Sequence, residues 1–191
     1  MEHITERSFN GVWNYYLSLE SDLANTSRYI EPAGQEETHS FEFAKIIILA
    51  CTEIESVMKA ICFELTNSEK GNMGEYKETI LTKFPKIVQA QVTVSRLGRD
   101  IVPFDGWDSG PLPWWDAYTA VKHKRGTEFE KASYHNAVLS LSALYILILY
   151  VARMKGIDFS SMNSTYIFSD YSRKIIACAP SKQLPDFASG K

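Results

Sequence analysis

Hydrophobic residues recur at spacings of three and four along several stretches of this chain, a period typical of helices that bury one face. The clearest stretch covers residues 40–66, where one apolar stripe runs through Phe43, Ile47, Ala50, Ile54, Val57, Ile61 and Leu65. Ser40 stands at the expected N-cap position, and the helix is expected to end at polar residues 66–68. The pattern therefore predicts a long amphipathic helix over 40–66.

Two shorter periodic stretches predict further helices. Residues 11–29 carry the stripe Val12, Tyr15, Tyr16, Leu19 and Leu23, followed by a Pro-Gly loop at 31–34. Residues 74–84 place four apolar side chains on one face just before Pro85. The stretch 86–112 differs: Gly and Pro interrupt any helix, and Val92 and Val94 alternate with polar residues. It predicts an irregular connection with a short strand or hairpin, of a length often associated with function.

The C-terminal half predicts two more helices. Pro113 occupies a typical first helical position for a helix over 113–125, with Gly126 as its end. Thr127 and Glu130 have capping-box spacing, so the last long helix is expected to begin there. Its apolar stripe ends near Gly156, an expected C-cap. Together these elements predict an all-α, four-to-five-helix up-and-down bundle with a long irregular connection before the helix at 113–125.

Composition places the chain among ordinary folded proteins. Of 191 residues, 45% are hydrophobic and 13% aromatic, which excludes a disordered chain. One domain over 1–191 is expected, with its core at about 11–155 and a C-terminal appendage at 156–191. The net charge of -3 gives no global basic surface, so contact with nucleic acid would need a local patch.

The compartment is inferred from cysteines and from apolar runs. The three cysteines (Cys51, Cys62 and Cys178) are widely spaced and lack a CxxC pair, which favours buried thiols in a reducing compartment. The N-terminus has no signal-peptide pattern, and the apolar run 138–152 is short for a membrane span. A cytoplasmic protein without membrane contact is therefore expected.

Candidate chemistry is densest on the helix at 113–125. Helical geometry places Asp116, Thr119 and His123 on one face and Tyr118, Lys122 and Arg125 on an adjacent one. An imidazole can exchange the proton of a ribose 2′-hydroxyl, and nearby cations can hold the scissile phosphate. Metal-independent RNA cleavage would use these groups. The alternative is a solvated helix end, whose cations interact with the helix dipole.

Residues 40–155 resemble the HEPN superfamily. The resemblance rests on Tyr118-Thr119-Ala120-Val121-Lys122-His123-Lys124-Arg125 and on the acidic helix containing Glu53-Ile54-Glu55-Ser56-Val57-Met58-Lys59. HEPN domains are helical and usually dimeric, and many are metal-independent endoribonucleases of phage-defence or toxin–antitoxin systems. The resemblance thus implies RNA, a second copy of the chain, and an antitoxin or defence protein as partners, with no cofactor. A catalytically silent dimerisation or interaction module is the alternative.

The family's catalytic motif is an Arg followed, after a few residues, by His. His123 matches the motif His, and Thr119 matches the polar position after the Arg. The Arg position itself falls on Tyr118, or on Ala117 or Asp116 at longer spacings. In the catalytic hypothesis, His123 is the general acid or base, and Tyr118 and Asp116 are orienting groups.

The remaining site residues have binding roles in this hypothesis. Lys122 and Arg125 would hold the phosphate, and the substrate would also contact Lys124, Thr119, Trp115 and Glu53. Glu53 flanks the apolar stripe and is expected to pair with Lys122 or Arg125. The chain has no metal-ligand spacing and no Gly-rich phosphate loop, so no metal or cofactor is expected.

Two further features, a group of tryptophans and an acidic helix residue, are explained by structural roles. Trp107, Trp114 and Trp115 are interpreted as an aromatic plug that anchors the connection. The alternative is a base-stacking platform, extended by Arg96 and Arg99. Glu55 and Lys59 have the spacing of a helical ion pair.

Overall fold

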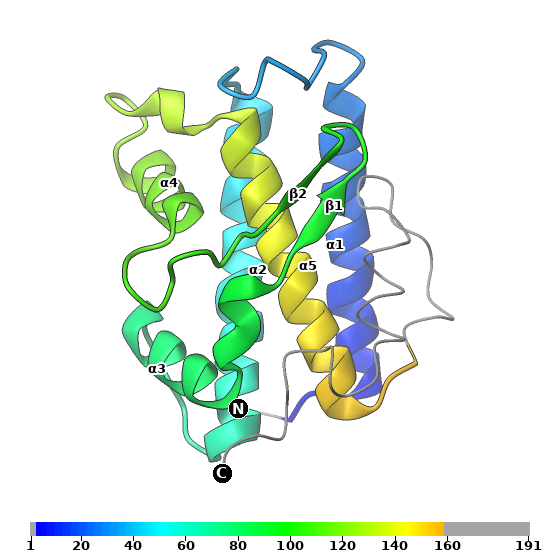
Figure 1. Cartoon of the computed structure of the whole chain (residues 1–191), viewed down its shortest axis with the longest axis vertical. Coiled ribbons are helices and arrows are strands. Elements are labelled where there is room, and N and C mark those ends of the chain that lie inside the picture. Colours follow the sequence, from blue (N-terminus) through cyan, green and yellow to red (C-terminus); the bar gives the residue numbers. More distant parts are fainter. Residues whose placement is uncertain (1–2, 159–191) are drawn as a thin grey trace.

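The secondary structure is helical apart from one small hairpin (Figure 1). The computed structural model describes residues 3–158, and the predicted appendage beyond residue 158, with Cys178, lies outside them. The described elements follow in chain order: α1 (Glu6–Thr26), α2 (Phe41–Thr66), α3 (Met73–Lys83), η1 (Pro85–Gln89), β1 (Val92–Val94), β2 (Arg99–Ile101), α4 (Pro113–His123), η2 (Phe129–Lys131) and α5 (Tyr134–Lys155). The prediction of a mostly helical fold is confirmed.

Local capping sets the ends of the first two helices. α1 begins earlier than predicted because Thr5 and Ser8 form a reciprocal capping box. The Ser40 hydroxyl accepts the Phe43 N–H at 3.1 Å, which confirms the predicted start of α2. Asn67 adopts a left-handed conformation (φ 52°) and ends α2.

The centre of the bundle is the pair α2 and α5. α1 packs against both helices on one side, and α4 packs against both on the other (Figure 1). α5 is long and apolar enough to cross a membrane, but 89% of its most apolar window is buried inside the protein. A helix that is hydrophobic all round belongs in such a core.

The connection from η1 to α4 contains the expected hairpin. β1 and β2 pair antiparallel with Val92 opposite Ile101, and both side chains are buried in the main core. Trp114 anchors the end of this connection: its ring is fully buried, and its Nε1–H donates to the Pro103 carbonyl at 2.7 Å. Trp107 is also buried, so two of the three tryptophans of the predicted aromatic plug are buried in the core, and Trp115 is only half-buried.

The predicted start of the last helix is wrong. Thr127 caps nothing there, since its hydroxyl donates to the Lys124 carbonyl within a turn. α5 begins at Tyr134, and Ser133 is its N-cap, accepting the Asn136 N–H at 3.2 Å. Backbone hydrogen bonds from Ser40, Tyr134 and His135 tie residues 132–135 to the 36–40 loop. This tertiary pairing holds the chain before Ser133 out of the helix. Gly156 ends α5 as predicted.

Candidate functional site

The sequence of α4 divides the helix into a buried and an exposed face. Trp114, Ala117 and Val121 are buried on the side that packs against α2 and α5. Asp116 and Thr119, which helical spacing places on one face, are both exposed. The Thr119 hydroxyl donates to the Trp115 carbonyl at 3.1 Å, one turn earlier. These two candidate residues therefore lie on the solvent side of α4.

Tyr118 connects α4 to the acidic residue of α2. Its ring is buried, and its hydroxyl lies 3.4 Å from Glu55 Oε2, a long hydrogen bond. Lys122 Nζ donates to the same hydroxyl at 3.0 Å and lies 5.1 Å from the ring centroid. The hydrogen bond with Tyr118 raises the pKa of Lys122, and the charge of Glu55 adds to this. Lys122 is therefore held in place as a cation at the edge of α4.

The next three residues complete an exposed group at the C-terminus of α4. We call Lys122, His123, Lys124 and Arg125 the basic end of α4; all four are exposed. Lys124 is the C-cap and forms an ion pair with Glu128 at 3.0 Å. Within residues 3–158, Arg125 forms no ion pair. The basic end thus offers the His123 imidazole and the Arg125 guanidinium to a ligand in solution.

Trp115 lies between the aromatic plug and this exposed group. It is half-buried, with its ring centroid 4.9 Å from that of Tyr118 and 6.0 Å from that of Trp114. Trp107 and Trp114 are fully covered and cannot stack on a base. Of the three tryptophans, Trp115 alone has exposed ring surface for such a contact.

Glu53 does not join the other predicted site residues. It lines a cavity between α1, α2 and α5, and it forms no ion pair with Lys122 or Arg125. The expected pairing is therefore wrong. Glu55, two residues later and on the other side of α2, approaches α4 through Tyr118 instead. Glu55 also forms no ion pair with Lys59 in the described part of the chain.

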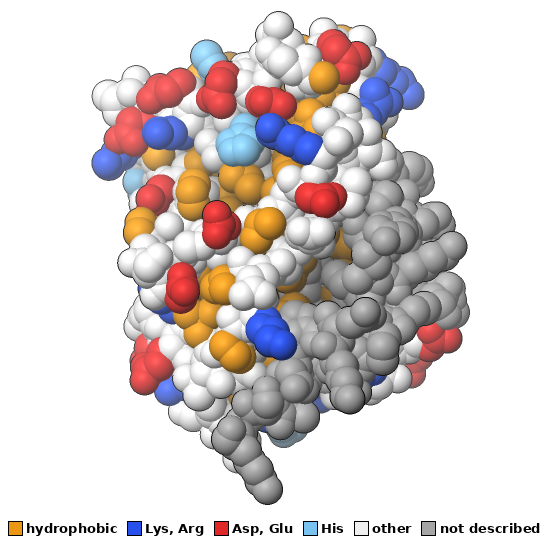
Figure 2. All heavy atoms as spheres, viewed as in Figure 1, with side chains coloured by type: hydrophobic (Ala, Val, Ile, Leu, Met, Phe, Trp, Pro, Cys, Tyr) orange, Lys and Arg blue, Asp and Glu red, His pale blue; other side chains and the backbone are white. Residues whose placement is uncertain are grey.

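Charges of both signs surround the basic end. Residues 116–131 carry four basic and three acidic side chains. Figure 2 shows Lys and Arg interspersed with Asp and Glu over the end of the bundle where α4 and η2 lie. The hairpin turn that carries Arg96 points toward α1, away from α4, and Arg99 pairs with Glu36 at 3.3 Å (Figure 1). These two arginines therefore do not extend the basic end.

Residues 3–158 contain no group of three or more His, Cys, Asp or Glu side chains arranged to hold a metal ion. Comparison with known proteins gave no match to a protein-family model, a curated protein or a solved structure.

Sequence reasoning missed two groups that the fold assembles. The contact between Tyr118 and Glu55 joins residues 63 positions apart. A second group joins the N-terminus to the ends of α2 and α5 through Glu64 and Lys155, which are 91 positions apart. No local spacing connects these residues, and only the packing of the helices brings them together.

Proposed function

We propose that this chain is a HEPN-like helical bundle that binds RNA through the basic end of α4. The observation that carries this proposal is the exposed Arg125 guanidinium, without an acidic partner in the described part of the chain, next to a Lys122 ammonium held by Tyr118. Arg and Lys hold phosphate oxygens with charge-assisted hydrogen bonds. Trp115 adds a half-buried ring on which an unpaired base would stack.

The catalytic form of this proposal is metal-independent cleavage of RNA. His123 would exchange the proton of a 2′-hydroxyl, while Arg125 and Lys122 would stabilise charge on the phosphate. Tyr118 would orient Lys122 rather than touch the substrate, since its hydroxyl is committed to that contact. The resemblance to HEPN domains adds a homodimer and an antitoxin or defence protein as partners, and the widely spaced cysteines favour a cytoplasmic location.

A non-enzymatic interaction module is the competing function. The interspersed charges around α4 favour it, because a protein partner with complementary charges would match such a surface better than a polyanion (Figure 2). In this function the link between Glu55, Tyr118 and Lys122 is purely structural. Substitution of His123 would then change no activity.

Binding of a labelled single-stranded RNA at several salt concentrations tests the proposal. Arg125→Gln should weaken binding and reduce the slope of log affinity against log salt by about one, because one phosphate contact is lost. Arg28→Gln, at an exposed arginine after α1, is the matched control and should leave both quantities unchanged. Equal binding by wild type and Arg125→Gln contradicts the proposal.

A further inference from the structure

A cavity of about 200 Å³ lies between the start of α1, the middle of α2 and the C-terminal part of α5. Apolar side chains from all three helices form most of its wall: Phe9, Val12, Val57, Ala60, Ile148 and Val151. An engineered protein cavity of about 150 Å³ holds benzene. This one therefore has room for a single ring with a short side chain.

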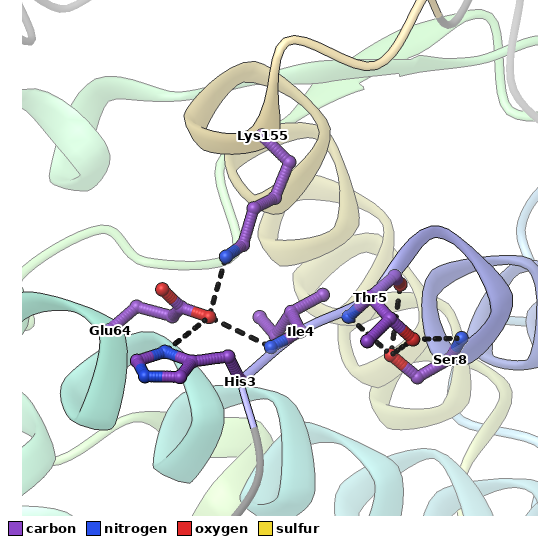
Figure 3. Close-up of polar contacts among 6 residues, drawn as sticks. All are labelled: His3, Ile4, Thr5, Ser8, Glu64 and Lys155. Carbon is purple, nitrogen blue, oxygen red and sulfur yellow. Dashed lines mark hydrogen bonds and ion pairs between the residues drawn. The ribbon is translucent and has the colours of Figure 1, made fainter.

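The N-terminal residues form one wall of the cavity and are fixed in place (Figure 3). Glu64 Oε1 accepts the Ile4 N–H at 2.7 Å and the Lys155 ammonium at 2.6 Å, and it lies 3.2 Å from His3 Nδ1. The capping box of Thr5 follows immediately. Because these contacts hold both sides of residue 4, the wall is formed before any ligand arrives.

Glu53 differs from the other polar side chains around the cavity. His3 is paired with Glu64, Thr5 with Ser8, and the Ser56 hydroxyl donates to the Thr52 carbonyl. The Glu53 carboxyl is half-buried and has no hydrogen bond or ion pair with another described residue. Burial raises its pKa. A carboxylate in such surroundings is stabilised by a cationic partner.

We propose that this cavity binds a small hydrophobic amine, with the ring against the apolar wall and the ammonium group on Glu53. The charge of Glu53 selects a cation over a neutral molecule of the same shape, and it repels an anion. This site is independent of the proposed RNA contact. Glu53 and Glu55 lie about 200° apart around α2, so the cavity faces α1 while the basic end of α4 lies on the other side.

Two probes of similar shape distinguish the contribution of charge to binding from that of apolar contact. We would titrate the full chain with 2-phenylethylamine and with the neutral 2-phenylethanol, using calorimetry near pH 7. Wild type should bind the amine more tightly. Glu53→Gln should weaken amine binding about tenfold or more, because the ion pair with the ammonium group becomes a hydrogen bond to a neutral amide, and it should leave binding of the alcohol unaffected. Glu78→Gln, at an exposed carboxylate of α3, is the control and should change neither probe.

A second variant tests the location of the site. Ala60→Leu adds side-chain volume to the cavity wall and should abolish binding of both probes, with circular dichroism reporting intact helices. Absence of amine binding to wild type, equal affinity for both probes, or unchanged amine affinity in Glu53→Gln or Ala60→Leu overturns the proposal. RNA binding should be normal in Glu53→Gln, so failure of this site and failure of the RNA contact are distinguishable.

Discussion

Replacement of Glu64 by Gln should destabilise the protein through loss of the charge that joins the N-terminus to α5. The Glu64 side chain is 13% exposed and that of Lys155 is 25% exposed, so water screens their pair only in part. Gln keeps an acceptor oxygen for both donors but removes the negative charge: the Ile4 N–H bond becomes a neutral one, and the ion pair with Lys155 becomes a hydrogen bond from an ammonium to a neutral amide. Hydrogen bonds to a charged group contribute about 1 kcal/mol more than neutral ones. The bonds from the Ile4 N–H and the Lys155 ammonium are both weakened, but Lys155 can turn toward solvent. We therefore expect the free energy of unfolding to fall by about 1–2 kcal/mol.

The dependence of this loss on pH identifies its cause. Burial acts to raise the pKa of Glu64, but hydrogen bonds from Lys155, the Ile4 N–H and His3 outweigh it, so the pKa lies below the ordinary value of 4.5. A carboxyl with a lowered folded-state pKa stabilises the protein above its unfolded-state pKa. This stabilisation is lost as pH falls through the folded-state value. The difference between wild type and Glu64→Gln should therefore shrink below about pH 4.5.

Urea unfolding followed by circular dichroism measures both effects. At neutral pH, Glu64→Gln should unfold at lower urea concentration, and Glu78→Gln should match wild type within about 0.5 kcal/mol. Two results would refute this reasoning. One is equal stability of wild type and Glu64→Gln at neutral pH, and the other is a difference that stays constant from pH 7 to acid pH.

Three further predictions concern α4 and its neighbours. Ser133→Ala should lower the free energy of unfolding in urea by about 1 kcal/mol through loss of the N-cap of α5, whereas Thr127→Ala should change it little. The reverse order would contradict the observed start of α5. Tyr118→Phe should lower the pKa of Lys122 toward that of an ordinary lysine, as measured by an NMR titration, and an unchanged pKa would show that the hydroxyl does not bind Lys122. Trp114→Phe should cost about 1–3 kcal/mol because it leaves the buried Pro103 carbonyl without its donor, and wild-type stability would contradict the anchoring role.

The helices could be predicted because their signals are local. The stripe along residues 40–66, the cap at Ser40 and the glycine after α5 each depend on a few neighbouring residues. The start of α5 could not be predicted in the same way. The Thr127-x-x-Glu130 spacing is a valid local signal, but backbone pairing of residues 132–135 with the 36–40 loop prevails over it.

The site could be predicted only as far as a single helix extends. Spacing along α4 placed Asp116 and Thr119 on one face of the helix, and the structure shows both side chains exposed. It could not choose between Glu53 and Glu55 as the carboxylate near α4, because both flank the buried stripe of α2. That choice depends on how α2 is rotated relative to α1 and α4, a property of the whole packing. The same holds for the cavity beside Glu53, whose wall comes from three separate helices.

Cleavage of a mixed pool of structured and single-stranded RNAs, with chelator present, tests the central claim most directly. Wild type, His123→Gln and His135→Gln would be purified through identical steps, the last as a matched histidine control on α5. If the basic end of α4 is a metal-independent catalytic site, wild type and His135→Gln cleave RNA while His123→Gln is inactive but still binds it. Equal cleavage by all three proteins, or an RNA affinity that does not respond to Arg125→Gln, would contradict the account.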